Sequence, residues 1–397
     1  MLRASGMMFR LGASGIILGM VIFGVLAVAT GQGLPSDYWK LPLASQGQAP
    51  TQWTDIERSL APEDCGSCHA DQYAEWRTSL HAKAFSPGLV GQLLTMDRNE
   101  AEGCMNCHAP LAEQKEAFAA ARHRGAGHRM PAVGLAAAGN SCAGCHRRDH
   151  RTYGPPPRAT GATGPGRVDA PHGGVTRTAD FERSEFCAAC HQFPADQAVN
   201  GKPLENTVVE WRDSPQARRG ETCQTCHMPE RKHLWRGIHD PAMVASGLTW
   251  KAEATPEGVR IELTNSGVGH AFPTYVTPKA VIRAVPLDAT GRPLERAAVE
   301  HVIQRRVVFE GGEWIEKHDT RLMPEQKATL LAPWASGDRI RAWLEIRPDD
   351  FYDHDVYDGL LAELPKNSPE AALIAEADRQ AAGSRFNLFE TIVERVR

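Results

Sequence analysis

The sequence lacks any cysteine outside a repeated motif. Its 397 residues contain ten cysteines, and all ten lie in five copies of the pattern C-x-x-C-H. No thiol is therefore left for a bridge between distant segments or for a separate metal site. The net charge is only −4 at neutral pH, so the chain lacks the positive excess that nucleic-acid binding requires. These two absences direct attention to the repeats.

The spacing of the repeats is the attachment signature of c-type haem, in which both thiols add to vinyl groups and the histidine binds the iron. Zinc ribbons do not need a histidine after every second cysteine, and disulfides within each pair would leave five histidines unexplained. We therefore predict five covalently bound haems and no other metal. The haem-binding residues are Cys65, Cys68, His69, Cys104, Cys107, His108, Cys142, Cys145, His146, Cys187, Cys190, His191, Cys223, Cys226 and His227.

An apolar run without charge occupies residues 11–29 and follows Arg3 and Arg10. It just reaches the length that spans a bilayer, whereas its end, Ala-Val-Ala, is typical of signal-peptide cleavage. We expect residues 1–30 to be an uncleaved signal-anchor rather than a cleaved signal peptide. Either form places the remaining chain in the periplasm or on the outer face of the cytoplasmic membrane of a bacterium, where haem is attached.

The composition then changes along the chain. Residues 31–60 are typical of a Pro/Gly/Ser linker, and residues 61–243 carry all five repeats. We expect this second part to be a mainly α or irregular domain that packs around its haems. Short helices are predicted at residues 71–84 and 111–121, and a Gly/Pro-rich loop at residues 153–175.

Beyond residue 246 apolar and polar residues alternate with the period of a β-strand. The pattern predicts a small antiparallel β-sandwich over residues 246–350. We expect C-terminal helices over residues 351–397, one of them between Ser368 and Gly383 and a last one at residues 387–396. The predicted strands are 248–254, 259–264, 280–287, 302–310, 327–331 and 339–346.

Each motif histidine leaves the opposite face of its iron open. Electron-transfer haems fill that face with a second histidine or a methionine, and catalytic haems keep it free. His81 lies twelve residues after His69, which is about 18 Å along a helix, so we expect it to bind the iron of a neighbouring haem. His239 is preferred to His233, and His128 to His123. The favoured second ligands are His81, His128, His172, His239 and His270.

The segment CGSCHADQYAEWRTSLH, which begins at Cys65, resembles the opening module of the cytochrome c-554 family of multihaem electron carriers. The similarity in spacing extends over residues 61–243. It implies bis-histidine haems in closely stacked pairs, with His81 supplied by the module Trp76, Ser79, His81. The loop around His270 is similar to G-H-x-F-P-T loops found downstream in larger multihaem cytochromes. Five motifs, the expected anchor and the β-domain depart from the family pattern.

The motifs and the resemblance predict a pentahaem cytochrome that carries electrons from a membrane-side donor to a periplasmic or extracellular acceptor. A quinol-linked membrane protein or a periplasmic cytochrome would be its redox partner, and a subunit docked through the sandwich is a compatible form. The alternative is an oxidoreductase of nitrite or hydroxylamine type with one five-coordinate haem. The sequence has no C-x-x-C-K motif, which marks pentahaem nitrite reductases, and nothing singles out one of its six tyrosines for a haem cross-link.

Overall fold

The computed structural model describes residues 33–123, 134–158 and 170–396. The described residues belong to one compact unit. The predicted apolar segment 11–29 and the predicted ligand His128 lie outside the described residues. None of the described helices combines the length and the apolar composition that a bilayer crossing needs.

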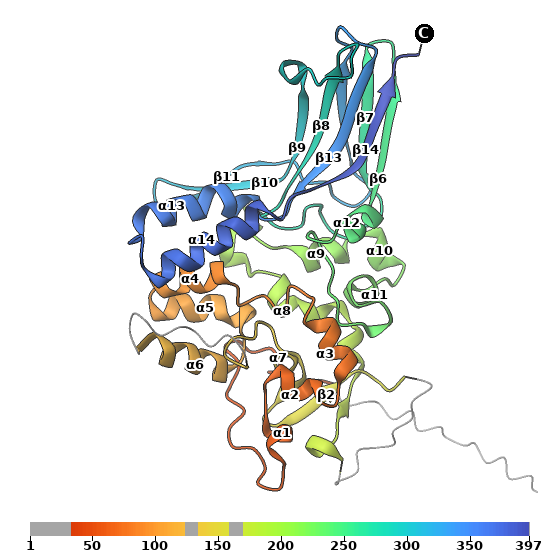
Figure 1. Cartoon of the computed structure of the whole chain (residues 1–397). Helices are drawn as coiled ribbons and strands as arrows, with labels where there is room; N and C mark the ends of the chain where they lie inside the picture. The colour runs from red at the N-terminus through yellow and green to blue at the C-terminus, as the bar shows by residue number, and fades with distance from the viewer. Residues whose placement is uncertain (1–32, 124–133, 159–169, 397) are drawn as a thin grey trace, which may run out of the picture. The chain divides into compact units, whose positions relative to one another are not determined.

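The motif-bearing part consists of short helices joined by loops and two-residue to four-residue strands (Figure 1). Four of the five motif histidines are the last residue of a helix. In a motif that is helical throughout, the two cysteines and the histidine are at positions i, i+3 and i+4, so they project from one face. The helices are α1 (Asp55–Arg58), α2 (Pro62–Gly66), α3 (Ala70–Trp76), α4 (Pro87–Thr95), α5 (Arg98–His108), α6 (Ala112–His123), α7 (Cys142–His146), α8 (Ala188–His191), α9 (Thr207–Arg212), α10 (Pro215–Arg218), α11 (Cys223–His227) and α12 (Pro241–Gly247). The strands are β1 (Arg147–Arg148), β2 (Arg151–Gly154), β3 (Thr176–Arg177), β4 (Ala198–Val199) and β5 (Lys202–Pro203).

The helix predicted at residues 71–84 is shorter than expected, because α3 ends at Trp76. The Thr78 hydroxyl donates to the Glu75 carbonyl at 2.7 Å, and the Ser79 hydroxyl donates to the Trp76 carbonyl at 2.7 Å. Hydroxyls that bond to nearby backbone in this way compete with helical hydrogen bonds. The chain therefore turns before His81 instead of carrying it on the helix.

Two antiparallel sheets follow, with the strand orders β12-β7-β6 and β14-β13-β8-β9. The predicted strand 302–310 is two strands, β9 and β10, and β10 pairs with the unpredicted β11. The strands are β6 (Leu248–Ala254), β7 (Gly258–Asn265), β8 (Lys279–Leu287), β9 (Val299–Ile303), β10 (Arg305–Glu310), β11 (Glu313–Asp319), β12 (Lys327–Pro333), β13 (Arg339–Arg347) and β14 (Phe386–Glu394).

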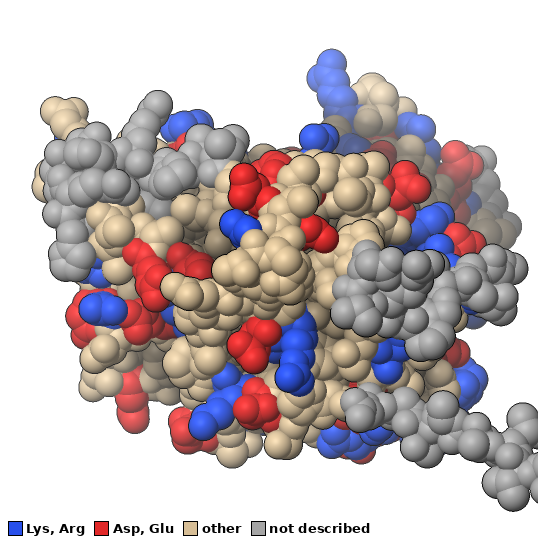
Figure 2. Space-filling view, turned by 90° about the horizontal axis from the view of Figure 1, so that it is seen from below, with Lys and Arg blue, Asp and Glu red and all other residues tan. Residues whose placement is uncertain are grey.

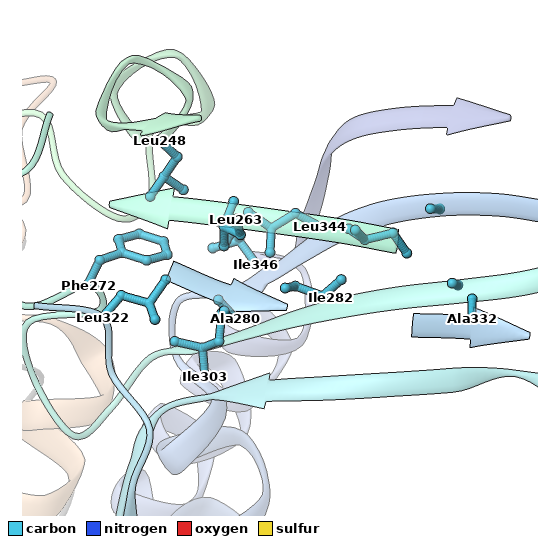
Figure 3. Packing of buried hydrophobic residues seen from close by; sticks show 14 of the residues in the cluster. Leu248, Leu263, Phe272, Ala280, Ile282, Ile303, Leu322, Ala332, Leu344 and Ile346 are labelled. Carbon is cyan, nitrogen blue, oxygen red and sulfur yellow. The ribbon is translucent and has the colours of Figure 1, made fainter. Parts of the chain in front are cut away.

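The two sheets share one hydrophobic core. Figure 3 shows side chains of β7, β8 and β13 meeting between the layers, among them Leu263, Ile282 and Leu344. All three are fully buried. Apolar residues alternate along these strands because successive side chains point to opposite faces of a sheet. The alternation read from the sequence therefore corresponds to the buried face of a sandwich.

The last element is a strand, and the helix predicted at residues 387–396 is wrong. β14 pairs antiparallel with β13, and its Phe386, Leu388 and Val393 pack against the sandwich core. The helix predicted after Ser368 is confirmed as α14 (Pro369–Ala382), whose first turn the Ser368 hydroxyl caps. Helix α14 lies beside α4, and α13 (Tyr357–Glu363) lies beside α14, so the C-terminal part returns to the motif-bearing helices (Figure 1).

The surface charge is mixed. Figure 2 shows acidic and basic side chains interspersed on the described part of the face seen from below. A continuous positive surface is the usual footprint of nucleic-acid binding. The visible part of this face carries no such continuous area, in keeping with the small net charge of −4.

Candidate functional site

Four of the five motif histidines each face a second histidine ring. A metal–imidazole bond of about 2.0 Å, with about 1.1 Å from that nitrogen to the ring centre, puts the centres of the two axial rings of one iron about 6.2 Å apart. The observed ring-centre distances are 6.5 Å for His69 and His172, 6.2 Å for His191 and His81, 6.3 Å for His146 and His233, and 6.3 Å for His227 and His270. The ring pairs therefore have the spacing that a six-coordinate haem iron requires.

These rings line a cavity of about 3010 Å³, which all ten cysteines also border. Ordinary small-molecule pockets have volumes of roughly 300–1,000 Å³, so this cavity is large enough for several macrocycles. The ten cysteines form no disulfide with one another, so both thiols of each motif are available to a haem. The cavity, the thiols and the ring pairs together fit covalently bound haem.

Burial keeps most of these rings neutral, and neutral imidazole is the form that binds a metal. Loss of water contact lowers the pKa of His81 to about 3 and the pKa values of His146 and His270 to about 4. His191 is different. Burial lowers the pKa of His191, but the neighbouring Glu205 carboxylate outweighs burial and raises it to about 9.

His81 is held by backbone contacts on both sides. The Asn140 amide donates to the His81 carbonyl at 2.8 Å, and the indole of Trp76 donates to the Asn140 carbonyl at 2.9 Å. The Trp235 ring packs edge-on against the His81 ring at 4.7 Å. The structure brings His81 to the fourth motif, away from its own, which matches the expectation that it serves a neighbouring haem.

His270 comes from the loop between β7 and β8, and the sandwich fixes this loop. The side-chain amide of Asn265 donates to the His270 carbonyl at 2.9 Å, and the backbone amide of Ala271 donates to the Glu210 carboxylate at 3.0 Å. Glu210 forms a buried ion pair with Arg321 at 3.3 Å. The β-domain therefore delivers a histidine to the fifth motif, as predicted from the loop sequence.

The structure places His233, and not the preferred His239, opposite a motif ring. The Nε2 atom of His239 lies 2.9 Å from a carboxylate oxygen of Asp349, whereas the His233 ring faces His146. The Glu75 carboxylate accepts a hydrogen bond from the His233 amide at 2.8 Å and so fixes the start of this turn. His172 lies where predicted, in the Gly/Pro-rich loop, with its amide donating to Glu57 at 2.9 Å.

The second motif differs from the other four. His108 donates from Nδ1 to the Ala84 carbonyl at 3.0 Å, but within the described ranges no second histidine ring faces it. His128, the expected partner, lies outside those ranges. The cavity wall includes Tyr275 and Tyr352, and both phenols interact electrostatically with Cys104 of this motif.

The motif histidines also differ in what their Nδ1 atoms contact. The acceptors for His108, His146 and His227 are backbone carbonyls, at 3.0, 2.8 and 2.6 Å. His191 instead contacts the carboxylate of Glu205 at 2.8 Å. The sequence reasoning did not identify Glu205.

Thiols of different motifs lie close enough to influence one another electrostatically. The pairs are Cys65 with Cys142, Cys107 with Cys190, and Cys187 with Cys223. Helix α2 lies beside α7, and α5 beside α8, in agreement with this arrangement (Figure 1). The first motif is therefore next to the third, and the fourth lies between the second and the fifth.

Comparison with known proteins finds similarity to multihaem cytochromes. The sequence model of a family described as cytochrome c554 and c-prime matches residues 64–127. The fold is similar to the crystal structure of a penta-heme cytochrome c552 from Thermochromatium tepidum, with a TM-score of 0.54 and 21% sequence identity over 78% of this chain and 96% of that chain. No curated protein matches the chain.

Proposed function

We propose that this chain, a multihaem c-type cytochrome, binds five haems and carries electrons between a membrane-side donor and a periplasmic or extracellular acceptor. The observation that carries the proposal is the set of four histidine ring pairs at 6.2 to 6.5 Å. Iron held by two histidines has no free position for a substrate, and it exchanges one electron without a change of ligands. The proposed location is the periplasm or the outer face of the cytoplasmic membrane, with residues 1–30 as signal or anchor.

The proposed ligand pairs are His69 with His172, His191 with His81, His146 with His233, and His227 with His270. The thiol contacts between motifs support an unbroken route that runs through the fourth site to the second and the fifth. Cys145 of the third motif interacts electrostatically with Cys187 and Cys190 of the fourth, which supports continuation of the route to the third and first sites.

His81 provides the first test. We expect His81→Ala to keep its full complement of covalent haem and to gain one high-spin haem in the electron paramagnetic resonance spectrum. His233→Ala should behave in the same way, whereas the matched variant His239→Ala should keep the wild-type spectrum. An unchanged low-spin spectrum in His81→Ala and His233→Ala would remove both from the ligand set.

The surroundings of His108 favour a second candidate function, an oxidoreductase of small nitrogen compounds at the second motif. The supporting observation is that the phenols of Tyr275 and Tyr352 line the cavity and interact electrostatically with Cys104 of this motif. A high-spin signal in the wild-type protein that responds to nitrite, hydroxylamine or nitric oxide would establish this function. A wild-type protein without a high-spin signal, together with a new one in His128→Ala, would exclude it.

A further inference from the structure

A β-hairpin holds Glu205 against a motif histidine. Strands β4 and β5 pair antiparallel, and the turn between them is Asn200-Gly201, whose φ values of 53° and 72° are those of a type I′ turn. The Phe193 amide donates to the Glu205 carbonyl at 2.9 Å and closes the base of the hairpin. The chain thus leaves His191 and returns to it fourteen residues later.

The sandwich anchors this hairpin. Arg305 of β10 is fully buried, and its guanidinium donates to the carbonyls of Val199 and Lys202 at 2.9 Å each and to that of Pro203. Lys202 pairs with Asp319 of β11 at 2.7 Å. The position of Glu205 is therefore set by the β-domain and not by the flexibility of a surface loop.

The Glu205 carboxylate interacts mainly with His191. Its side chain is 15% exposed, and among the described residues no lysine or arginine nitrogen pairs with it. The Thr207 hydroxyl is its one other side-chain contact within the described ranges, at 3.4 Å. A carboxylate that accepts the second N–H of a metal-bound histidine makes that ligand more basic. A more basic ligand stabilises the ferric over the ferrous state.

We propose that Glu205 is a tuning residue that lowers the reduction potential of the haem at Cys187–His191 below the value that a neutral acceptor would give. This inference rests on the proposed ligand set. The other acceptors on motif histidines in the described structure are neutral backbone carbonyls, so the fourth site alone combines a motif histidine with a full negative charge.

The position of the fourth site makes this tuning important for transfer. The segments that carry the fourth motif lie beside those of the second and fifth motifs, so an electron that moves between these two sites crosses it. Because its reduction potential is low, the fourth haem is the least favourable site to reduce on the route between the second and the fifth sites. Glu205 would therefore control the rate of exchange between the two sides of the route.

The test is a redox titration of the full-length, haem-loaded protein, followed by optical and electron paramagnetic resonance spectra. Glu205→Gln keeps the size of the side chain and removes its charge. We expect the ratio of reduced to oxidised haem at the fourth site to rise at least tenfold at fixed potential, which is about 59 mV for a one-electron couple. Glu205→Asp, which retracts the carboxylate, should shift the same haem in the same direction.

Glu185→Gln is the matched control, because Glu185 lies near Cys187 of the same motif but pairs with Arg183 at 3.8 Å and contacts no ligand ring. Its effect should be less than about threefold. A shift in Glu205→Gln no larger than that of Glu185→Gln would overturn the inference. His81→Ala identifies the low-spin signal of the fourth site. If that variant shows no high-spin haem, the ligand set fails, and if it does while Glu205→Gln shifts nothing, only the role of Glu205 fails.

Discussion

The motif-bearing helices and the β-sandwich bury apolar surface in different ways. The sandwich has one continuous core, in which residues of β7, β8 and β13 are fully buried. The motif-bearing part has only small side-chain clusters, such as Val90, Leu93 and Met105 between α4 and α5. Its helices instead surround a cavity of about 3010 Å³ lined by motif residues.

The two regions therefore differ in what stabilises their structure. Strands of the sandwich are specified by side-chain packing that the sequence alone supplies. The motif-bearing helices, most of them too short to be stable alone, depend on anchors from elsewhere in the chain and, under the proposed function, on covalent attachment to haem. Arg305, Glu210 and Asn265 are such anchors, since each connects the sandwich with a segment that carries a proposed ligand or its partner.

The largest effect that tests this dependence is expected from Arg305→Met. The change removes the buried donor of three hairpin carbonyls, while Glu316 keeps its ion pair with Lys202 at 2.9 Å. At about 1–3 kcal/mol for each unsatisfied carbonyl, the loss of unfolding free energy should be about 3–5 kcal/mol. It should also shift the potential of the fourth haem in the same direction as Glu205→Gln. Chemical denaturation and redox titration measure the two effects.

The control is Lys317→Met on the adjoining strand β11. Lys317 pairs with Glu310 at 2.6 Å, but both side chains are exposed, so the loss should be about 0–1 kcal/mol. Equal destabilisation by the two substitutions would mean that the hairpin is not anchored through Arg305.

Ile282→Ala tests whether the core of the sandwich can be weakened without a change at the proposed haem ligands. Ile282 is fully buried between the sheets, and its truncation should lower the unfolding free energy of the sandwich by about 2–5 kcal/mol. The bis-histidine spectra should not change, because Ile282 contacts no motif residue. Denaturation followed by circular dichroism, with haem absorbance as a second probe, measures both. Leu331→Ala, at a site that is 46% exposed, is the control and should have little effect. A loss of low-spin haem in Ile282→Ala would contradict the independence of the two cores.

The sequence was sufficient for those features that local chemistry determines. The spacing of the motif cysteines selected residues that border one cavity, and the alternation along β6, β7, β8 and β13 identified the sandwich. The Gly/Pro loops around His172 and His270 were correctly singled out as carriers of histidines that meet motif rings. In these cases the residue types and their neighbours in the chain carry the information.

The sequence was insufficient where distant segments decide. His233 and His239 both lie within twelve residues after His227, and their contacts separate them: His239 meets Asp349, whereas the His233 ring faces His146. Strand β14 looked helical because its pairing with β13 leaves it at a sheet edge, half-buried. Glu205 was missed, although the Asn200-Gly201 turn is a recognised hairpin signal that would have placed it beside His191.

The smallest effect concerns the backbone packing that replaces a side-chain core around His81. A Cβ atom on Gly139 would lie 2.4 Å from the His81 carbonyl and 2.7 Å from the Ala84 amide, and neither backbone atom moves easily. Gly139→Ala should cost about 1–3 kcal/mol and displace His81, so part of the fourth haem should become high-spin. Electron paramagnetic resonance and thermal unfolding measure these changes. Gly359→Ala in α13, where an added methyl group meets nothing within 4 Å, should be neutral or slightly stabilising. A Gly139→Ala protein with a fully low-spin spectrum would show that His81 is held by its iron and not by the backbone around it.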